Sequence, residues 1–189
     1  MNHPDAERWN ARYVANGEAR LEDQPRQLLL DYAHLIPKQG IALDAAAGVA
    51  NNGTFLARRG MHVIALDISI TALQLATRRA QKESLPFSAA VYDLSHLRLP
   101  MNHFDVIINF HFLERATFPV FQQALRAGGL IIFETFLRSN EDTSSPDYYL
   151  EPGELQNAFP DFEIIHSRER NIPATTKVTA QLVARKTAP

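Results

Sequence analysis

The stretch ALDAAAGVANNG, from Ala42 to Gly53, follows an apolar segment and precedes a helical pattern. In α/β folds a strand–turn–helix of this kind is where a nucleotide-like ligand is held. Such turns usually carry three glycines, but only Gly48 and Gly53 remain here. Three interpretations are therefore open: a cofactor loop that tolerates alanine, a decayed site, or a turn in a packed core.

Seven short apolar runs are predicted to be strands. Five of them alternate with helical patterns, which predicts right-handed crossovers and a parallel sheet. These five are Ile41–Ala45, His62–Asp67, Phe87–Asp93, Phe104–Phe110 and Gly129–Phe136. The connection between Phe162–Glu169 and Lys177–Lys186 is too short for a crossover and predicts an antiparallel hairpin. The expected fold is α/β: a Rossmann-like seven-stranded sheet, mostly parallel with an antiparallel C-terminal strand, and with helices on both faces.

Helical patterns fill most of the connections between these strands. We expect helices over Asn52–Arg59, after Ser69 as the capping residue, and over Thr117–Arg126. Residues 1–40 contain two further helices and no strand, so we expect a single domain over residues 1–189 with an N-terminal helical cap. The polar stretch from Arg138 to Asp147 is a candidate mobile loop.

Composition excludes several classes of function. The 189 residues include no cysteine, which rules out disulfides, thiolate zinc sites and a cysteine nucleophile. A net charge of -2 argues against a nucleic-acid partner. No apolar run approaches the roughly 18 residues of a membrane span, and the first residues are polar, so we expect a cytoplasmic protein without a membrane partner. The seven histidines show no metal-ligand spacing, so no metal is expected.

Asp44 ends the strand immediately before the turn, where its charge would repel a pyrophosphate. It suits a ligand with an ammonium group and no phosphate, such as S-adenosylmethionine. Without phosphates to accommodate, Ala46 and Ala50 become tolerable, while Gly48 remains where positive φ or ligand contact is expected. If Ala50 begins the helix, glycine there would cost up to ~1 kcal/mol of stability.

The second and third strands also finish on acids. Asp67 lies about twenty residues beyond the turn, where a carboxylate can accept both ribose hydroxyls. Asp93 follows the third strand and could accept from an adenine amino group. A single strand-end aspartate is usually a cap or turn residue, but three at one edge favour a ligand site.

At these residues the chain resembles the class I S-adenosylmethionine-dependent methyltransferases over nearly its whole length. LDAAAGVANNGTFLARRG is similar to the first motif of the family, with Ala46 and Ala50 as departures, and LRAGGLIIFETF resembles the segment entering the fifth strand. WNARY and YYLEPGELQNAFPDFEII resemble the tellurite-resistance and thiopurine methyltransferase branch.

This resemblance implies roles for individual residues. Asp44, Ala46 and Gly48 would hold the methionine portion of S-adenosylmethionine. Asp67 and Ile68 would bind the ribose and adenine, Asp93 and Leu94 the adenine edge, and Asn109 and Phe110 would lie beside the sulfonium. Trp9, Arg12 and Tyr13 share one helical face, which in this branch closes over the cofactor, although Trp9 could equally anchor the N-terminal helix in the core.

The candidate catalytic residues are His111, Glu134, Arg12 and Arg115. His111 could act as a general base or line the pocket wall, and Glu134 could orient an acceptor or bond the end of the sheet. The two arginines would offer forked donors to an anionic acceptor. We therefore expect in-line methyl transfer to a small-molecule acceptor, leaving S-adenosylhomocysteine, by a monomer or homodimer.

Rival functions lack their own motifs. A short-chain dehydrogenase would need a Tyr-x-x-x-Lys pair, and a nucleic-acid amino-methyltransferase would carry Asn-Pro-Pro-aromatic after the fourth strand; neither is present. A non-catalytic methyltransferase-like domain, serving as a binding partner or scaffold, remains the alternative, with Ala50 as its best evidence.

Overall fold

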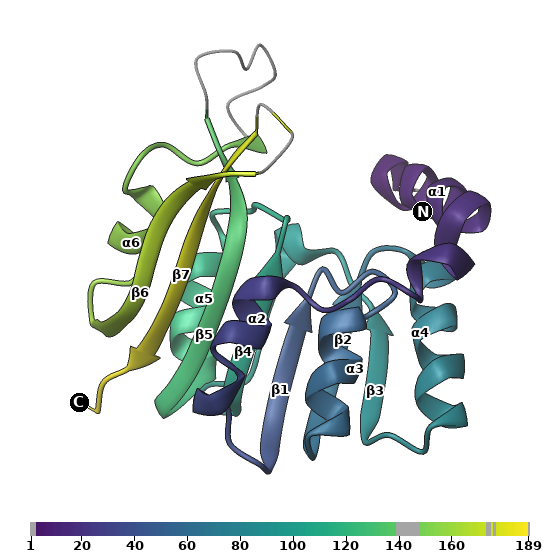
Figure 1. Ribbon diagram of the computed structural model, residues 1–189, viewed down its shortest axis with the longest axis horizontal. Coiled ribbons are helices and arrows are strands. Elements are labelled where there is room, and N and C mark those ends of the chain that lie inside the picture. The colour runs from purple at the N-terminus through teal and green to yellow at the C-terminus, as the bar shows by residue number, and fades with distance from the viewer. Residues whose placement is uncertain (1–2, 139–147, 173–174, 176, 189) are drawn as a thin grey trace. The chain divides into compact units, whose positions relative to one another are not determined.

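The computed structural model describes residues 3–138, 148–172, 175 and 177–188. Its strands are β1 (Gly40–Ala45), β2 (Met61–Asp67), β3 (Phe87–Val91), β4 (Phe104–Phe110), β5 (Leu125–Leu137), β6 (Phe162–Asn171) and β7 (Val178–Lys186). They form one sheet in the order β3-β2-β1-β4-β5-β7-β6 (Figure 1). Pairs β1–β2, β2–β3 and β4–β5 are parallel, and β7 is antiparallel to both β5 and β6. The predicted fold class is confirmed.

The helices lie between these strands and before β1. They are α1 (Pro4–Arg20), α2 (Gln27–Asp31), α3 (Asn51–Arg58), α4 (Ile70–Lys82), α5 (Thr117–Ala124) and α6 (Glu154–Asn157), with 3-10 turns η1 (Ala33–Leu35) and η2 (Leu94–His96). Ser69 caps α4 as expected, because its hydroxyl accepts the Ala72 N–H at 3.2 Å. Helix α5 ends two residues early, since Leu125 and Arg126 already belong to β5.

The chain divides into two compact units, residues 1–97 and 98–189. The first holds β1, β2 and β3 with α1 to α4, and the second holds β4 to β7 with α5 and α6. Figure 1 shows α4 beside β3 in the first unit and β5, β7 and β6 side by side in the second. That residues 1–189 act as a single domain stays a prediction.

Small residues let the turn after β1 join the core of the first unit. Ala50, Ala65, Leu73 and Ala76 form a buried cluster against which Phe87 packs. Three alanine side chains permit a close approach of α4 to β2. The turn after β1 therefore also contributes to the core of the first unit.

Aromatic rings fill one face of β5 in the second unit. Phe118 and Phe121 of α5 meet Phe133 at centroid distances of 5.8 and 6.4 Å, and Phe159 meets Phe162 at 5.3 Å. Because side chains alternate along a strand, Glu134 lies on the opposite face of β5 from Phe133. That second face carries the polar residues described below.

One connection between the parallel strands lacks a helix. Between β3 and β4 the chain forms only η2, so this crossover has no α-helix. The polar loop expected over residues 138–147 lies outside the described residues except for Arg138.

Candidate functional site

The turn after β1 contains three left-handed residues at alternate positions. They are Ala46, Gly48 and Ala50, with φ of 54, 56 and 53°. The positive φ expected at Gly48 is confirmed. Ala50 is the N-cap of α3 and is fully buried, in a conformation that costs an L-residue about 1–2 kcal/mol. The cost expected for glycine here applies to a residue that begins the helix; Ala50 is instead the left-handed N-cap, where glycine would also relieve strain.

Backbone N–H groups of the turn are bonded within the protein. The Gly48 N–H donates to Asp67 Oδ2 at 2.7 Å. The Ala47 N–H donates to the Leu66 carbonyl at 2.9 Å, and the Ala50 N–H to the Ala47 carbonyl at 2.8 Å. A pyrophosphate-binding turn presents such groups to its ligand instead. This bonding pattern favours a ligand without phosphates.

Asp44 reaches from the end of β1 to the first turn of α3. Its side chain is 2% exposed, and its Oδ2 accepts the Gly53 N–H at 2.9 Å. A Cβ on Gly53 would lie only 2.7 Å from that oxygen. The second retained glycine of the motif is thus required for the approach of Asp44 to the helix, a role that the sequence analysis did not assign.

Asp67 joins the turn to the start of α4. Besides the Gly48 N–H, its carboxylate accepts the Ser69 N–H at 2.8 Å through Oδ1. The Ile68 N–H also bonds this carboxylate, which has about four acceptor sites, so one site remains for a ribose hydroxyl. Ile68, expected to pack on adenine, follows β2 and is half-buried.

Both of these carboxyl groups are held in an environment that disfavours their charge. Burial raises the pKa of Asp44 to about 7, against the lowering effect of the Gly53 N–H, and the charge of Asp67 adds to the rise. Burial also raises the pKa of Asp67, although the N–H groups of Ser69 and Gly48 oppose it. A cation bound nearby would favour the ionised forms. The pair therefore suits a positively charged ligand.

Helix α1 covers the turn through Tyr13. A Cβ on Gly48 would lie 2.4 Å from the Tyr13 hydroxyl oxygen, so glycine is needed for this contact. Trp9 stacks on Tyr13 with centroids 6.0 Å apart, and the Arg12 guanidinium lies 5.0 Å from the Trp9 ring centroid. These three residues share one helical face, as the sequence predicts. That they cover a cofactor stays a prediction.

Two residues that the sequence analysis missed hold α1 and the turn in place. Asn10 Oδ1 accepts from the Ser69 hydroxyl at 2.8 Å and from the Thr71 N–H at 3.2 Å, which joins α1 to the start of α4. Arg79 donates to the carbonyls of Val49 and Leu21, at 2.6 and 3.1 Å. Asn10 stands inside the WNARY motif, whereas nothing in the sequence distinguishes Arg79 from a surface arginine.

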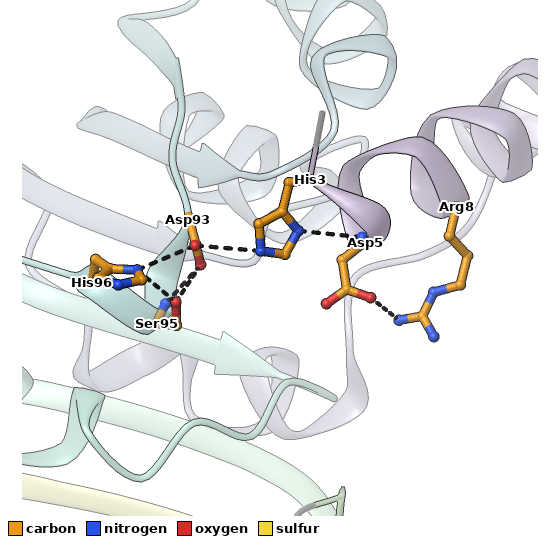
Figure 2. A network of polar contacts seen from close by, with 6 residues as sticks. All are labelled: His3, Asp5, Arg8, Asp93, Ser95 and His96. Atoms are coloured by element: carbon orange, nitrogen blue, oxygen red, sulfur yellow. Dashed lines mark hydrogen bonds and ion pairs between the residues drawn. The ribbon is translucent and has the colours of Figure 1, made fainter. Parts of the chain in front are cut away.

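Asp93 belongs to a polar network at the end of β3, drawn in Figure 2. Its carboxylate accepts from the Ser95 N–H and hydroxyl at 3.0 and 2.7 Å, and it lies 3.2 Å from His96 Nδ1 and 3.5 Å from His3 Nε2. Partial burial raises the pKa of Asp93, but the bonds from Ser95 and His96 and the charge of His3 bring it below its ordinary value. Leu94 is 4% exposed. That Asp93 and Leu94 bind an adenine edge stays a prediction.

In the second unit, Asn109 and Phe110 end β4 as buried residues. Asn109 Nδ2 donates to the Phe112 carbonyl at 3.3 Å. Its Oδ1 is buried and has no hydrogen-bond partner among the residues that the structure describes. A buried acceptor without a partner is unusual and fits a donor supplied by a ligand.

His111 follows β4 with a left-handed backbone, φ 58°. Its Nε2 lies 3.3 Å from Glu134 Oε1, and its ring stacks on Phe136 with centroids 4.6 Å apart. A non-glycine residue in this conformation is uncommon and is often found at functional sites. The structure thus brings together His111 and Glu134, which the sequence named separately.

Arg115 does not have the surroundings expected of an acceptor-binding cation. Its Nε and Nη2 pair with the two carboxylate oxygens of Glu154 at 2.5 and 2.9 Å, and Nη2 also donates to the Tyr149 carbonyl at 3.0 Å. The forked donors expected to meet an anionic acceptor are already engaged. This pairing favours a structural role for Arg115, whose partner Glu154 was not foreseen, and its expected contact with the acceptor stays a prediction.

Within residues 3–138, 148–172, 175 and 177–188, no three His, Asp or Glu side chains are placed to bind one metal ion. No helix in those ranges is both long and apolar enough to cross a bilayer.

Known proteins share several of these features. A family model described as a methyltransferase domain matches residues 42–129, which include the turn, Asp67, Asp93 and the end of β4. Phosphoethanolamine N-methyltransferase 1 of Arabidopsis thaliana is 28% identical over 118 residues, covering 59% of this chain and 24% of that protein. The chain thus matches about a quarter of the length of this curated relative.

Solved structures share the fold. TehB from Haemophilus influenzae superposes with a TM-score of 0.76 at 20% identity, covering 84% of this chain and 61% of that one. A phosphoethanolamine N-methyltransferase 2 of Haemonchus contortus, in complex with S-adenosyl-L-methionine, gives 0.70 at 16% identity, covering 86% and 52%. By its matched domain and its fold, the chain resembles the class I S-adenosylmethionine-dependent methyltransferases and their TehB branch, as the sequence predicts.

Proposed function

We infer that the protein transfers a methyl group from S-adenosylmethionine to a small-molecule acceptor. The observation that carries this proposal is the pair of buried carboxyl groups beside the turn, Asp44 and Asp67. The N–H groups of Ala47, Gly48 and Ala50 in this turn are bonded within the protein. This arrangement disfavours a phosphate and favours an ammonium group.

The residues present fit the cofactor in chemical type. Asp44 with the backbone of Ala46 and Gly48 would hold the amino-acid end, whose ammonium offsets the buried carboxylate. Asp67 and Ile68 would hold the ribose and adenine, and Asp93 and Leu94 the adenine edge. Tyr13 and Trp9 would cover the site, and Asn109 and Phe110 would lie beside the sulfonium. When bound, the cofactor supplies a methyl group on a sulfonium, which a nucleophile takes by in-line displacement.

His111 is the residue that we assign as general base. Its contact with Glu134 supports this role, because a carboxylate beside one imidazole nitrogen fixes the tautomer and stabilises the protonated ring. A base is useful for an acceptor whose nucleophile still carries a proton, such as an amine or a hydroxyl. As that nucleophile attacks the methyl carbon and the C–S bond breaks, its proton passes to His111.

Two observations support a small acceptor. The curated relative and one of the solved structures carry names that place the methyl group on the nitrogen of phosphoethanolamine, a small amine. The net charge of -2 lacks the excess of basic residues that a nucleic-acid backbone requires. Arg12 is a candidate contact for an anionic group on the acceptor, whereas the ion pair of Arg115 with Glu154 favours a structural role for that arginine.

The scaffold alternative loses its main support. Its best evidence was Ala50, but the methyl group of Ala50 lies in the core cluster with Ala65, Leu73 and Ala76. Alanine at this position is therefore a packing residue and does not indicate a decayed ligand site.

Calorimetric titration with S-adenosylhomocysteine tests the cofactor part of the proposal. Because the pKa of Asp44 is about 7, we expect binding about tenfold tighter at pH 8 than at pH 6. Asp44→Asn should bind more weakly and lose this pH dependence, whereas Asp31→Asn, at the exposed end of α2, should behave as wild type. Absence of binding at millimolar ligand would overturn the proposal.

Transfer of labelled methyl groups tests the acceptor part. Wild-type protein and S-adenosylmethionine are added to separate small-molecule and macromolecular fractions of a cell extract. We expect incorporation in the small-molecule fraction, with loss of incorporation in His111→Asn. Label confined to the macromolecular fraction would contradict a small acceptor.

A further inference from the structure

Four polar side chains form a hydrogen-bonded row across the second unit, from the end of β4 through β5 and β7 to β6. His111 Nε2 lies 3.3 Å from Glu134 Oε1, Gln181 Nε2 lies 2.5 Å from Glu134 Oε2, and His166 Nε2 lies 3.4 Å from Gln181 Oε1. The three strands that carry the last three residues lie side by side in Figure 1. Gln181 and His166 have no part in the function argued so far.

A β-bulge brings His166 into this row. Between Ile164 and His166 the register of β6 against β7 shifts, so that His166 lies opposite Val183. Without the shift, His166 would lie opposite Leu182 and point to the other face of the sheet, because side chains alternate along a strand. Bulges are frequent beside functional sites, where they redirect a side chain. Here the bulge places an imidazole on the face of Gln181.

The direction of every hydrogen bond in the row follows from Glu134. An ionised carboxylate only accepts, so Gln181 must present its NH₂ group and turn its carbonyl toward His166. For the same reason the nitrogen of His111 that faces Glu134 must carry the proton. The remaining nitrogen of His111, Nδ1, is then the basic one, and it has no hydrogen-bond partner among the described residues.

Burial makes Gln181 important to this arrangement. Gln181 is 7% exposed, and the side chain of Glu134 is 12% exposed. A carboxylate this far from water loses stability when one of its donors is removed, and it then turns away or takes up a proton. Either response weakens its bond to His111.

We propose that Gln181, supported by His166, is a positioning residue that holds Glu134 and thereby keeps His111 in the tautomer with a basic Nδ1. This proposal rests on the proposed function, in which His111 takes a proton from the acceptor. It adds that the acceptor proton goes to Nδ1, and that the β6–β7 hairpin sets the state of the base.

Nitrogen NMR of the His111 ring tests the proposal without any substrate, because the two tautomers differ in which nitrogen resonates as unprotonated. His111→Asn identifies the signal. Wild type should show the Nε2–H tautomer alone at pH 8. In Gln181→Met, which keeps the side-chain volume, the Nδ1–H tautomer should rise at least about tenfold, equivalent to about 1.4 kcal/mol. Glu134→Gln should give a similar rise.

Gln122→Met is the matched control. Gln122 also donates a partly buried hydrogen bond, to the Ala158 carbonyl in the same unit, and this bond does not involve Glu134. It should leave the tautomer of His111 unchanged. Should Gln181→Met not fold, His166→Phe removes the partner of Gln181 while keeping an aromatic ring, and it should shift the tautomer in the same direction.

The outcomes separate this proposal from the one on which it rests. An Nδ1–H tautomer in wild type, or an unchanged tautomer in folded Gln181→Met, would overturn the role of Gln181 whatever the activity. Failure of the wild-type protein to bind S-adenosylhomocysteine would instead overturn the proposed function and leave the tautomer result standing. Gln181→Met should bind S-adenosylhomocysteine within twofold of wild type.

Discussion

Replacing Ala50 with glycine tests whether the turn after β1 stores strain. Ala50 has a φ of 53°, and its methyl group is fully buried against Ala65, Leu73 and Ala76. Ala76 lies in the same buried cluster but within the right-handed helix α4. The same substitution at the two positions therefore differs chiefly in backbone conformation.

Three contributions determine the effect at Ala50. Glycine removes the strain of the left-handed conformation, which stabilises the folded protein by about 1.5 kcal/mol. Against this, the added freedom of glycine in the unfolded chain costs about 0.7 kcal/mol, and loss of the buried methyl costs about 0.8 kcal/mol. We expect Ala50→Gly to leave the free energy of unfolding nearly unchanged.

Ala76→Gly has no strain to relieve. Glycine inside a helix costs about 1 kcal/mol, and the lost methyl again costs about 0.8 kcal/mol, so we expect a loss of about 2 kcal/mol. Ala46→Gly is the complementary case, because Ala46 is left-handed but only half-buried. It should stabilise the protein by up to about 1 kcal/mol.

Urea unfolding of the three variants and the wild type provides the measurement. With a slope of about 2 kcal/mol per molar, the expected gap between Ala50→Gly and Ala76→Gly is about 1 M in the midpoint. The slopes themselves should agree, since all variants bury nearly the same surface. If Ala50→Gly lowers the midpoint as much as Ala76→Gly does, the left-handed residues store no strain and the reasoning fails.

Three further changes test the surroundings of the site. Because the pKa of Asp44 is raised to about 7, the folded protein holds a proton that the unfolded chain has released above pH ~4. Stability should fall as pH rises from about 4 to about 7, by at most about 4 kcal/mol, and urea midpoints of Asp44→Asn should lack this contribution. Gly53→Ala should lower the free energy of unfolding by about 1–3 kcal/mol, because the new Cβ would lie 2.7 Å from Asp44 Oδ2. Thermal unfolding measures this loss, and an unchanged melting temperature would show that the carboxylate moves freely. Arg115→Ala and Glu154→Gln should show a coupling energy of up to about 1 kcal/mol in a double-mutant cycle of unfolding. Methyl transfer by Arg115→Ala should stay within a few-fold of wild type. A large loss of activity without coupling would favour Arg115 as an acceptor contact.

The sequence by itself determined the features that depend on neighbouring residues. Short apolar runs predicted all seven strands, and β4 has the predicted bounds, Phe104–Phe110, at both ends. Ser69 could be recognised as a cap because capping acts over three residues, and Gly48 as left-handed because glycine alone adopts that conformation without cost. Asp44, Asp67 and Asp93 were found at strand ends because strand ends follow from periodicity.

Only the tertiary structure decided which distant residues meet. Arg115 and Glu154 are 39 positions apart, and Glu134 and Gln181 are 47 apart, so no local pattern could join them. The left-handed conformation of Ala50 is set by packing against α4 and β2, which outweighs the preference of alanine for right-handed backbone. The bulge that turns His166 toward Gln181 depends on the pairing of β6 with β7. Sequence periodicity reports which face of an element is buried, whereas the partners on that face are chosen by how the elements pack.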